Sequence, residues 1–192
     1  MFIAVVVITT IGILLFGAKI FASSSGGDGQ KVDFGGNIGS KNVRVTISKN
    51  QGKIEIEKNL FSNCAADLTG FQDEAKISGV ISLGAGQKAV EISGLAGAHA
   101  ENRQYFIIDK NFCPVAIAFV KDNQINYNIY SDEPNFAVQD INGDGATDIT
   151  SDYRNYDLDP IANGTRDQYI YNQKNQDFEF SRSENIQTKV TN

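Results

Sequence analysis

The sequence has little of several residue types that common functions require. Its 192 residues include one histidine and two cysteines, and 17 lysines and arginines stand against 23 acidic residues. The formal net charge of −6 argues against a nucleic-acid-binding protein, because such proteins need a basic surface. Cys64 and Cys113 lie far apart in the chain, without the spacing of zinc or redox motifs.

The common motifs of catalysis are also missing. The single histidine, His99, lies in a Gly- and Ala-rich turn, and no GxSxG nucleophile motif is present. The Gly84–Gly86 segment predicts a hairpin turn and not a phosphate-binding loop, since no helix with Lys-Ser or Lys-Thr follows it. Glu55, Glu57 and Glu91 fall on predicted strands, where exposed carboxylates are common. We therefore expect no enzymatic activity and no catalytic residues.

The first 22 residues contain no acidic side chain and a single lysine. A helix through Phe2–Phe21 would be about 30 Å long, roughly the thickness of the hydrocarbon core of a membrane. The Ser- and Gly-rich residues 23–30 predict a flexible linker behind it. We interpret residues 1–22 as an uncleaved membrane anchor. A cleaved signal segment, which would have a basic start, and a buried core helix are the alternatives.

The two cysteines predict a disulfide. We expect an acidic domain behind a membrane segment to lie outside the cytoplasm, where paired cysteines are oxidised. We therefore expect Cys64 and Cys113 to be bonded, with two separate buried thiols as the alternative. A disulfide that closes a loop of this length would contribute about 4 kcal/mol in the chain-entropy model.

Short alternating runs of apolar and polar residues predict an all-β, mainly antiparallel domain over residues 31–182. Hydrophobic residues make up 41% of the sequence, which is enough for a folded core. A polar tail is expected at 183–192, and Cys64–Ala75 can accommodate a short helix. The expected strands, spaced as in antiparallel β domains, are Val43–Ile47, Ile54–Glu57, Ile77–Leu83, Lys88–Ser93, Gln104–Asp109, Val115–Lys121, Ile125–Tyr130, Tyr169–Tyr171 and Asp177–Phe180.

The strongest local pattern is Asp140-Ile-Asn-Gly-Asp-Gly-Ala-Thr-Asp148. Oxygen-bearing side chains stand at positions 1, 3, 5 and 9 of this loop, and Gly145 at position 6 allows a sharp turn. Hard oxygen ligands in this number suit Ca²⁺ better than Mg²⁺, which prefers octahedral geometry and retained water. An ordinary Asp/Asn/Gly turn without an ion is the alternative. The expected side-chain ligands are Asp140, Asn142, Asp144 and Asp148, and the carbonyl of Ala146 can supply a further oxygen.

Two familiar calcium motifs do not fit this loop. An EF-hand carries a bidentate Glu at position 12, where this chain has Ser151, and a dockerin would need a second copy. Instead, Phe136–Ile149 (FAVQDINGDGATDI) resembles one FG-GAP/VCBS-type repeat, the calcium-loop blade unit of integrin-like β-propellers. The resemblance implies the same calcium ligands, with Ala146 as the backbone ligand. Strands are expected on both sides of the loop, over Phe136–Gln139 and Ala146–Asp152.

These patterns together predict a membrane-tethered, extracytoplasmic, calcium-binding β domain that acts as a structural or binding module. Its strands would form a propeller-blade-like or sandwich arrangement, and its partner would be a protein or a glycan. If the N-terminal segment is cleaved, the domain is secreted. A pilin-like surface subunit is the alternative, although the apolar segment lacks the usual Glu and a basic leader. A calcium-stabilised hydrolase is a third and less favoured hypothesis.

Overall fold

The computed structural model describes residues 29–33, 42–48, 52–59, 62–72, 75–97, 100–132, 135–154 and 163–187. The expected membrane anchor at residues 1–22 and most of the linker lie outside these ranges. Within them, no helix is long and apolar enough to cross a membrane. The described residues form antiparallel β-sheets and contain no helix, so the expected all-β class is confirmed.

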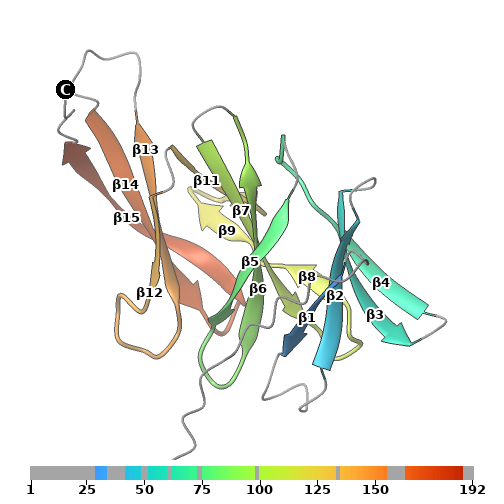
Figure 1. Ribbon diagram of the computed structural model, residues 1–192. Coiled ribbons are helices and arrows are strands. Elements are labelled where there is room, and N and C mark those ends of the chain that lie inside the picture. Colours follow the sequence, from blue (N-terminus) through green and yellow to red (C-terminus); the bar gives the residue numbers. More distant parts are fainter. Residues whose placement is uncertain are drawn as a thin grey trace, which may run out of the picture.

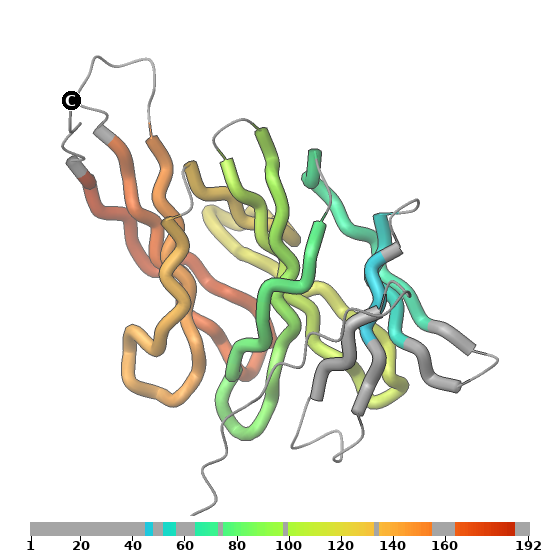
Figure 2. Tube along the Cα trace, viewed as in Figure 1, coloured from blue at the N-terminus to red at the C-terminus, as the bar shows by residue number. Residues whose placement is uncertain are grey.

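The strands belong to three sheets, which are stacked as layers with the central sheet between the N-terminal and the C-terminal sheet (Figures 1 and 2). The N-terminal sheet has the order β1-β2-β3-β4, with β1 Gly29–Asp33, β2 Asn42–Ser48, β3 Lys53–Asn59 and β4 Ser62–Asp67. The central sheet has the order β11-β7-β6-β5, with β8 also paired to β7; its strands are β5 Lys76–Ser82, β6 Lys88–Leu95, β7 Ala100–Ile108, β8 Pro114–Ala116 and β11 Ile129–Asp132.

The C-terminal sheet is the widest of the three. Its order is β10-β9-β15-β14-β13-β12, with β9 Phe119–Lys121, β10 Gln124–Asn126, β12 Phe136–Gln139, β13 Asp148–Arg154, β14 Asn163–Asn172 and β15 Asp177–Gln187. Every described pairing is antiparallel except that of β9 with β15, where Phe119 lies beside Phe178. The expected strands Val43–Ile47 and Ile54–Glu57 are confirmed and pair as the hairpin β2–β3, and Tyr169–Tyr171 and Asp177–Phe180 are confirmed within the hairpin β14–β15.

The central sheet is buried on both faces. Alternate side chains of β6 and β7 point to opposite sides, as the two-residue period of a strand requires. Ala89, Tyr105 and Ile107 enter a core shared with the C-terminal sheet. Val90, Ile92, Phe106 and Ile108 pack against Val45, Ile54 and Ile56 of the N-terminal sheet in a second core. Each fully buried apolar side chain of this kind contributes about 1.5–3 kcal/mol.

Two of the expected strands are each split between two sheets, which corrects the sequence prediction. Val115–Lys121 becomes β8, which pairs with β7, and β9, which pairs with β15. Ile125–Tyr130 becomes β10, which pairs with β9, and β11, which pairs with the first half of β7. The chain therefore leaves the central sheet after β8, adds a hairpin to the edge of the C-terminal sheet, and returns as β11.

Aromatic packing explains this crossing. The Phe119 ring is stacked on that of Phe178, with 5.0 Å between the centroids, and meets the edge of Tyr169 at 5.4 Å. Tyr105 of the central sheet lies 5.7 Å from Phe178. Because Phe119 is only 2% exposed here, its burial holds β9 on the C-terminal sheet.

Three other expectations change at element boundaries. The short helix at Cys64–Ala75 is wrong, because β4 occupies its first residues and pairs with β3. The first strand begins at Gly29, inside the expected linker. The last strand runs through Gln187, beyond the expected end of the domain, because β14 continues to pair with it.

Truncating Phe106 tests the doubly buried sheet. Phe106 is 0% exposed in the core between the N-terminal and central sheets. Phe106→Ala should lower the free energy of unfolding by about 3–5 kcal/mol, because it leaves a cavity in a packed core. Urea denaturation measures the loss. The control is Leu95→Ala on β6, where the side chain is 47% exposed and the change should stay near 0.5 kcal/mol. Equal losses would contradict the packing.

Candidate calcium loop and its surroundings

The Asp140–Asp148 segment connects β12 to β13, as the sequence predicts. Gly143 and Gly145 adopt positive φ angles of 79° and 84°, so the backbone can curl back on itself. The Asp140 carboxylate lies inside this curl. Its Oδ1 accepts hydrogen bonds from the amides of Gly143 and Asp144 at 2.7 and 3.2 Å, and its Oδ2 accepts one from Gly145 at 2.9 Å. The first residue of the pattern thus organises the turn.

The next two polar side chains follow the same curl. The Asn142 amide nitrogen donates to Asp144 Oδ2 at 3.0 Å, and the Asp144 backbone amide donates to Asn142 Oδ1 at 2.9 Å. Asp144 Oδ1 in turn accepts from the amide of Ala146 at 2.8 Å. Asp140, Asn142 and Asp144 are all exposed, so their unused lone pairs face solvent.

Asp148 occupies a different environment, because it is 0% exposed. Its Oδ2 accepts from the backbone amide of Ile141 at 2.8 Å, and its Oδ1 accepts from that of Tyr171 at 2.9 Å. Among the described residues, no lysine or arginine forms a salt bridge with this carboxylate. Asp148 therefore joins the start of the loop to β14 through two hydrogen bonds from backbone amides to its buried carboxyl group.

The loop also docks on the central sheet. The amide of Thr147 donates to the carbonyl of Ser82 at 2.9 Å, and Ala146 is 1% exposed in the core. The β5–β6 turn also packs against the β14–β15 turn. At Gly84 there is no room for a larger residue, because a Cβ atom there would lie 2.5 Å from Gln173 Nε2. Tyr171 donates its hydroxyl hydrogen to Gln87 at 3.4 Å. Three hairpin ends thus meet at this loop.

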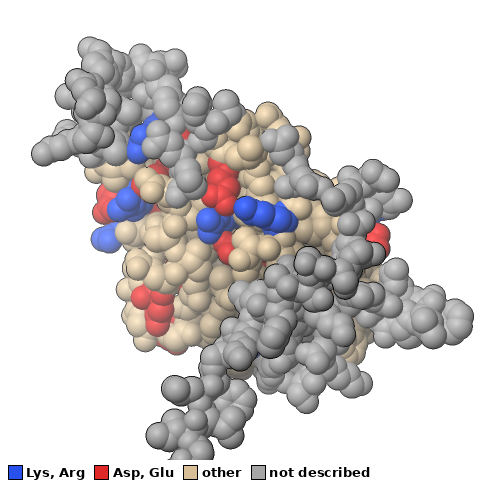
Figure 3. Space-filling model, viewed as in Figure 1, with Lys and Arg blue, Asp and Glu red and all other residues tan. Residues whose placement is uncertain are grey.

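The loop supplies side-chain oxygen atoms from Asp140, Asn142, Asp144 and Asp148. Within the described residues, no three His, Cys, Asp or Glu side chains are placed together as a metal-binding group. The carboxylates of Asp140, Asp144 and Asp148 accept hydrogen bonds from backbone amides, and every one of their oxygens except Asp140 Oδ1, which accepts two, keeps a further lone pair. Figure 3 shows a group of acidic side chains without basic neighbours at the lower left, where the β12–β13 loop lies in Figure 1.

Cys64 and Cys113 form a disulfide, as the sequence predicts, with 5.1 Å between their Cα atoms. Cys64 lies on β4 of the N-terminal sheet, and Cys113 lies just before β8 of the central sheet. The bond therefore ties together two sheets that share one of the hydrophobic cores. No free cysteine is found among the described residues.

Two of the carboxylates considered for catalysis, Glu55 and Glu91, lie on different sheets. Glu91 lies on the face of the central sheet that carries Tyr105, whose hydroxyl donates to Glu91 Oε1 at 2.9 Å. Arg103 Nη1 donates to the same oxygen at 2.6 Å. Burial, followed by the Glu91 charge, raises the pKa of Tyr105 well above its usual value. Glu55 is on the N-terminal sheet, and His99 and the Glu57 side chain lie outside the described part of the molecule.

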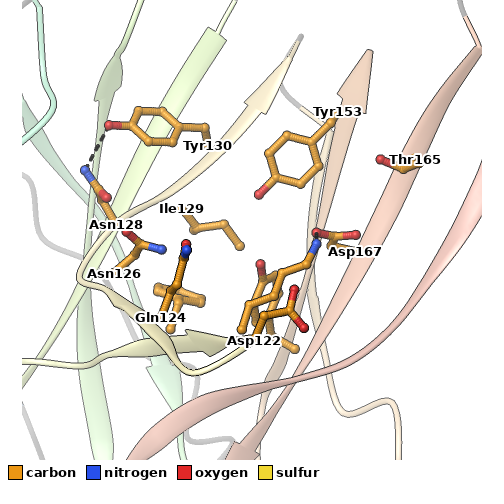
Figure 4. A pocket seen from close by; sticks show the side chains of 12 residues that line it. Asp122, Gln124, Asn126, Asn128, Ile129, Tyr130, Tyr153, Thr165 and Asp167 are labelled. Atoms are coloured by element: carbon orange, nitrogen blue, oxygen red, sulfur yellow. Dashed lines mark hydrogen bonds and ion pairs between the residues drawn. The ribbon is translucent and has the colours of Figure 1, made fainter. Parts of the chain in front are cut away.

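A pocket of about 460 Å³ lies between the segment β9–β11, which crosses from the C-terminal sheet to the central sheet, and the strands β13 and β14 (Figure 4). No motif marks it in the sequence, because its residues come from segments that only the crossing brings together. The exposed aromatic and amide residues around 124–130 were the available signal. Lining side chains include Gln124, Asn126, Ile129, Tyr130, Tyr153 and Asp167.

Replacing Asp148 tests its role in the loop. Asp148→Ala leaves the buried amide of Tyr171 and the half-buried amide of Ile141 without an acceptor, so the free energy of unfolding should fall by about 2–5 kcal/mol. Urea denaturation in the presence of a calcium chelator measures this effect apart from any ion. Asp144→Ala is the matched control, because water can replace its exposed carboxylate, and it should cost about 1 kcal/mol or less. Similar losses for both variants would contradict the assignment.

Removing the disulfide tests its contribution to stability. The double variant Cys64→Ala, Cys113→Ala should lose about 4 kcal/mol of unfolding free energy, because the unfolded chain is no longer constrained. Equilibrium unfolding of the variant and of the oxidised native chain gives the difference. Mass spectrometry with and without reductant checks the bond directly, and two free thiols in the oxidised preparation would contradict it.

Comparison with known proteins gives no family model, curated protein or solved structure that matches the chain. The loop, the disulfide and the packing of the three sheets are therefore the observations from which a function follows. Each of these features holds different sheets of the β-domain together.

Proposed function

We propose that the chain is a membrane-tethered, extracytoplasmic β-domain that binds Ca²⁺ in the Asp140–Asp148 loop and acts as a structural or binding module. The observation that carries this proposal is the position of the loop. Its buried Asp148 contacts β14, and its Thr147 contacts the end of β5. An ion held here would stabilise the junction between the central and C-terminal sheets.

The chemistry of the loop favours a cation. The Asp148 carboxyl group is buried and, within the described ranges, forms no salt bridge with a basic side chain. A bound cation lowers the cost of burying a carboxylate. The exposed oxygens of Asp140, Asn142 and Asp144 lie on the same short curl. Together with the carbonyl of Ala146, these residues would hold the ion, and Ca²⁺ accepts the six to eight oxygen ligands that such a loop and water supply.

The sheet around the loop supports the resemblance to an FG-GAP/VCBS-type repeat. The strands β12, β13, β14 and β15 are neighbours in sequence order, so they form a four-stranded antiparallel meander. The calcium loop joins its first two strands. The N-terminal sheet is also a four-stranded meander. We propose that these sheets are propeller-blade-like units, each packed against one face of the central sheet.

The location proposal rests on two features. The disulfide between Cys64 and Cys113 is stable in an oxidising compartment. The uncharged segment that begins at Phe2 has the length and composition of a membrane anchor. We place the domain outside the cytoplasm, at the cell surface or in a periplasm, with a protein or glycan as its partner and no nucleic acid.

Calcium should raise the thermal stability of the oxidised chain. An ion at about 100 times its dissociation constant adds about 2.7 kcal/mol to the native state, which corresponds to an increase of about 5–10 °C in the midpoint of unfolding. Thermal denaturation followed by circular dichroism, with Ca²⁺ or with a chelator, measures this shift. Mg²⁺ should have a smaller effect, because it prefers tighter octahedral coordination.

Two aspartate variants separate the loop from general charge effects. Asp140→Ala should abolish the calcium-dependent shift, while Asp122→Ala, an exposed acid in the β9–β10 turn, should leave it unchanged. A midpoint that does not respond to calcium, or that responds equally in both variants, would refute calcium binding by the loop.

A further inference from the structure

The pocket beside the β9–β11 crossing has walls from both neighbouring sheets. Gln124 and Asn126 come from β10, Ile129 and Tyr130 from β11, and Tyr153 from β13. Figure 4 shows the Tyr153 hydroxyl directed into the pocket toward Ile129, with the two amide side chains on the facing side. At about 460 Å³, the pocket falls within the range of small-molecule sites.

The charges of the pocket are largely balanced. Lys121 Nζ lies 2.5 Å from Asp167 Oδ2, and the Asp167 side chain is 4% exposed. Ser183 donates a hydrogen bond to the other oxygen of that carboxylate. Asp122 adds one exposed carboxylate to the lining. An anionic ligand would therefore meet carboxylates and a lysine that is already paired, which disfavours phosphate or sulfate groups.

The uncharged polar groups suit a ligand rich in hydroxyls. Each amide of Gln124 and Asn126 offers both donors and an acceptor, so it can bind two neighbouring hydroxyl groups at once. Burial raises the pKa of Tyr153 and of Tyr169, which also lines the pocket. A phenol is un-ionised near neutral pH, so the Tyr153 hydroxyl, which is directed into the pocket, can donate a hydrogen bond to a ligand.

Aromatic surface is exposed at the same place. Tyr127, between the lining residues Asn126 and Asn128, is 52% exposed, and a ring of this kind can pack against the C–H face of a sugar while its hydroxyl stays in water. The Tyr130 ring does not face the pocket, because its hydroxyl accepts a hydrogen bond from Asn128 and lies near Gly70 (Figure 4). Binding of a peptide by strand addition is less favourable here, because the edge strand β10 has only three residues with which a peptide can pair.

We propose that this pocket binds a sugar unit of an uncharged glycan, with the amides of Gln124 and Asn126 and the Tyr153 hydroxyl as hydrogen-bonding groups. The proposal deepens the binding-module role proposed above and rests on it. It does not involve the calcium loop, whose residues are absent from the lining.

The test is titration of the full chain with lactose, cellobiose, chitobiose and mannobiose, in a detergent without a sugar headgroup. Saturation-transfer NMR and calorimetry detect binding, which is expected at millimolar concentration or below for at least one sugar. The double variant Gln124→Ala, Asn126→Ala should weaken that binding about tenfold or more, because two hydrogen-bonding groups are lost. Both positions are exposed, so folding should be unaffected.

The matched control is Gln139→Ala, which removes an exposed amide from β12, the opposite edge strand of the same sheet. It should bind like the native chain. No binding of any of the four sugars, equal binding by the double variant, or binding of sulfated heparin fragments or peptides alone would overturn the proposal. A calcium-dependent melting midpoint in a chain that binds none of the sugars would refute the sugar site and leave the calcium module intact.

Discussion

The central parts of β6 and β7 are buried on both faces, so the side chains there pack alternately against one or the other outer sheet. Tyr105 and Phe106 are neighbours in the chain, yet they enter different cores. A slip of one residue in the register would send each set of side chains to the wrong core. This constraint fixes the positions of the outer sheets. It also accounts for the disulfide, which ties the N-terminal sheet to the central one near their shared core.

The crossing from β8 to β11 follows from the same demand for burial. The edge of β7 holds β11 along its first half and β8 along its second half, and the chain between them has to leave the central sheet. Phe119 carries it to the C-terminal sheet, because the ring is buried between aromatic residues of both sheets. The pocket is a consequence of this route. The hairpin β9–β10 belongs to the C-terminal sheet and the following strand β11 to the central sheet, so residues of both sheets line the pocket.

The Asp140–Asp148 loop combines local and distant interactions. Asp140 shapes the turn through hydrogen bonds to residues that follow it closely, which is why the spacing of the motif could be recognised. The burial of Asp148 depends instead on β14, whose Tyr171 amide binds it from a distant part of the chain. In the proposed calcium module, the ion would stabilise both the local turn around Asp140 and the contact of Asp148 with β14. Glu91 provides a contrast, since Arg103 and Tyr105 already compensate its charge.

The sequence by itself determined the β-class, most strands, both confirmed hairpins, the disulfide and the curled loop. These features depend on side-chain alternation, on turn residues or on a single available cysteine pair. Only the tertiary structure decided which sheet each strand joins. Val115–Lys121 alternates like one strand, but its two halves bury their side chains against different partners. The pocket was invisible for the same reason, because Gln124 and Tyr153 become neighbours only when two sheets pack together.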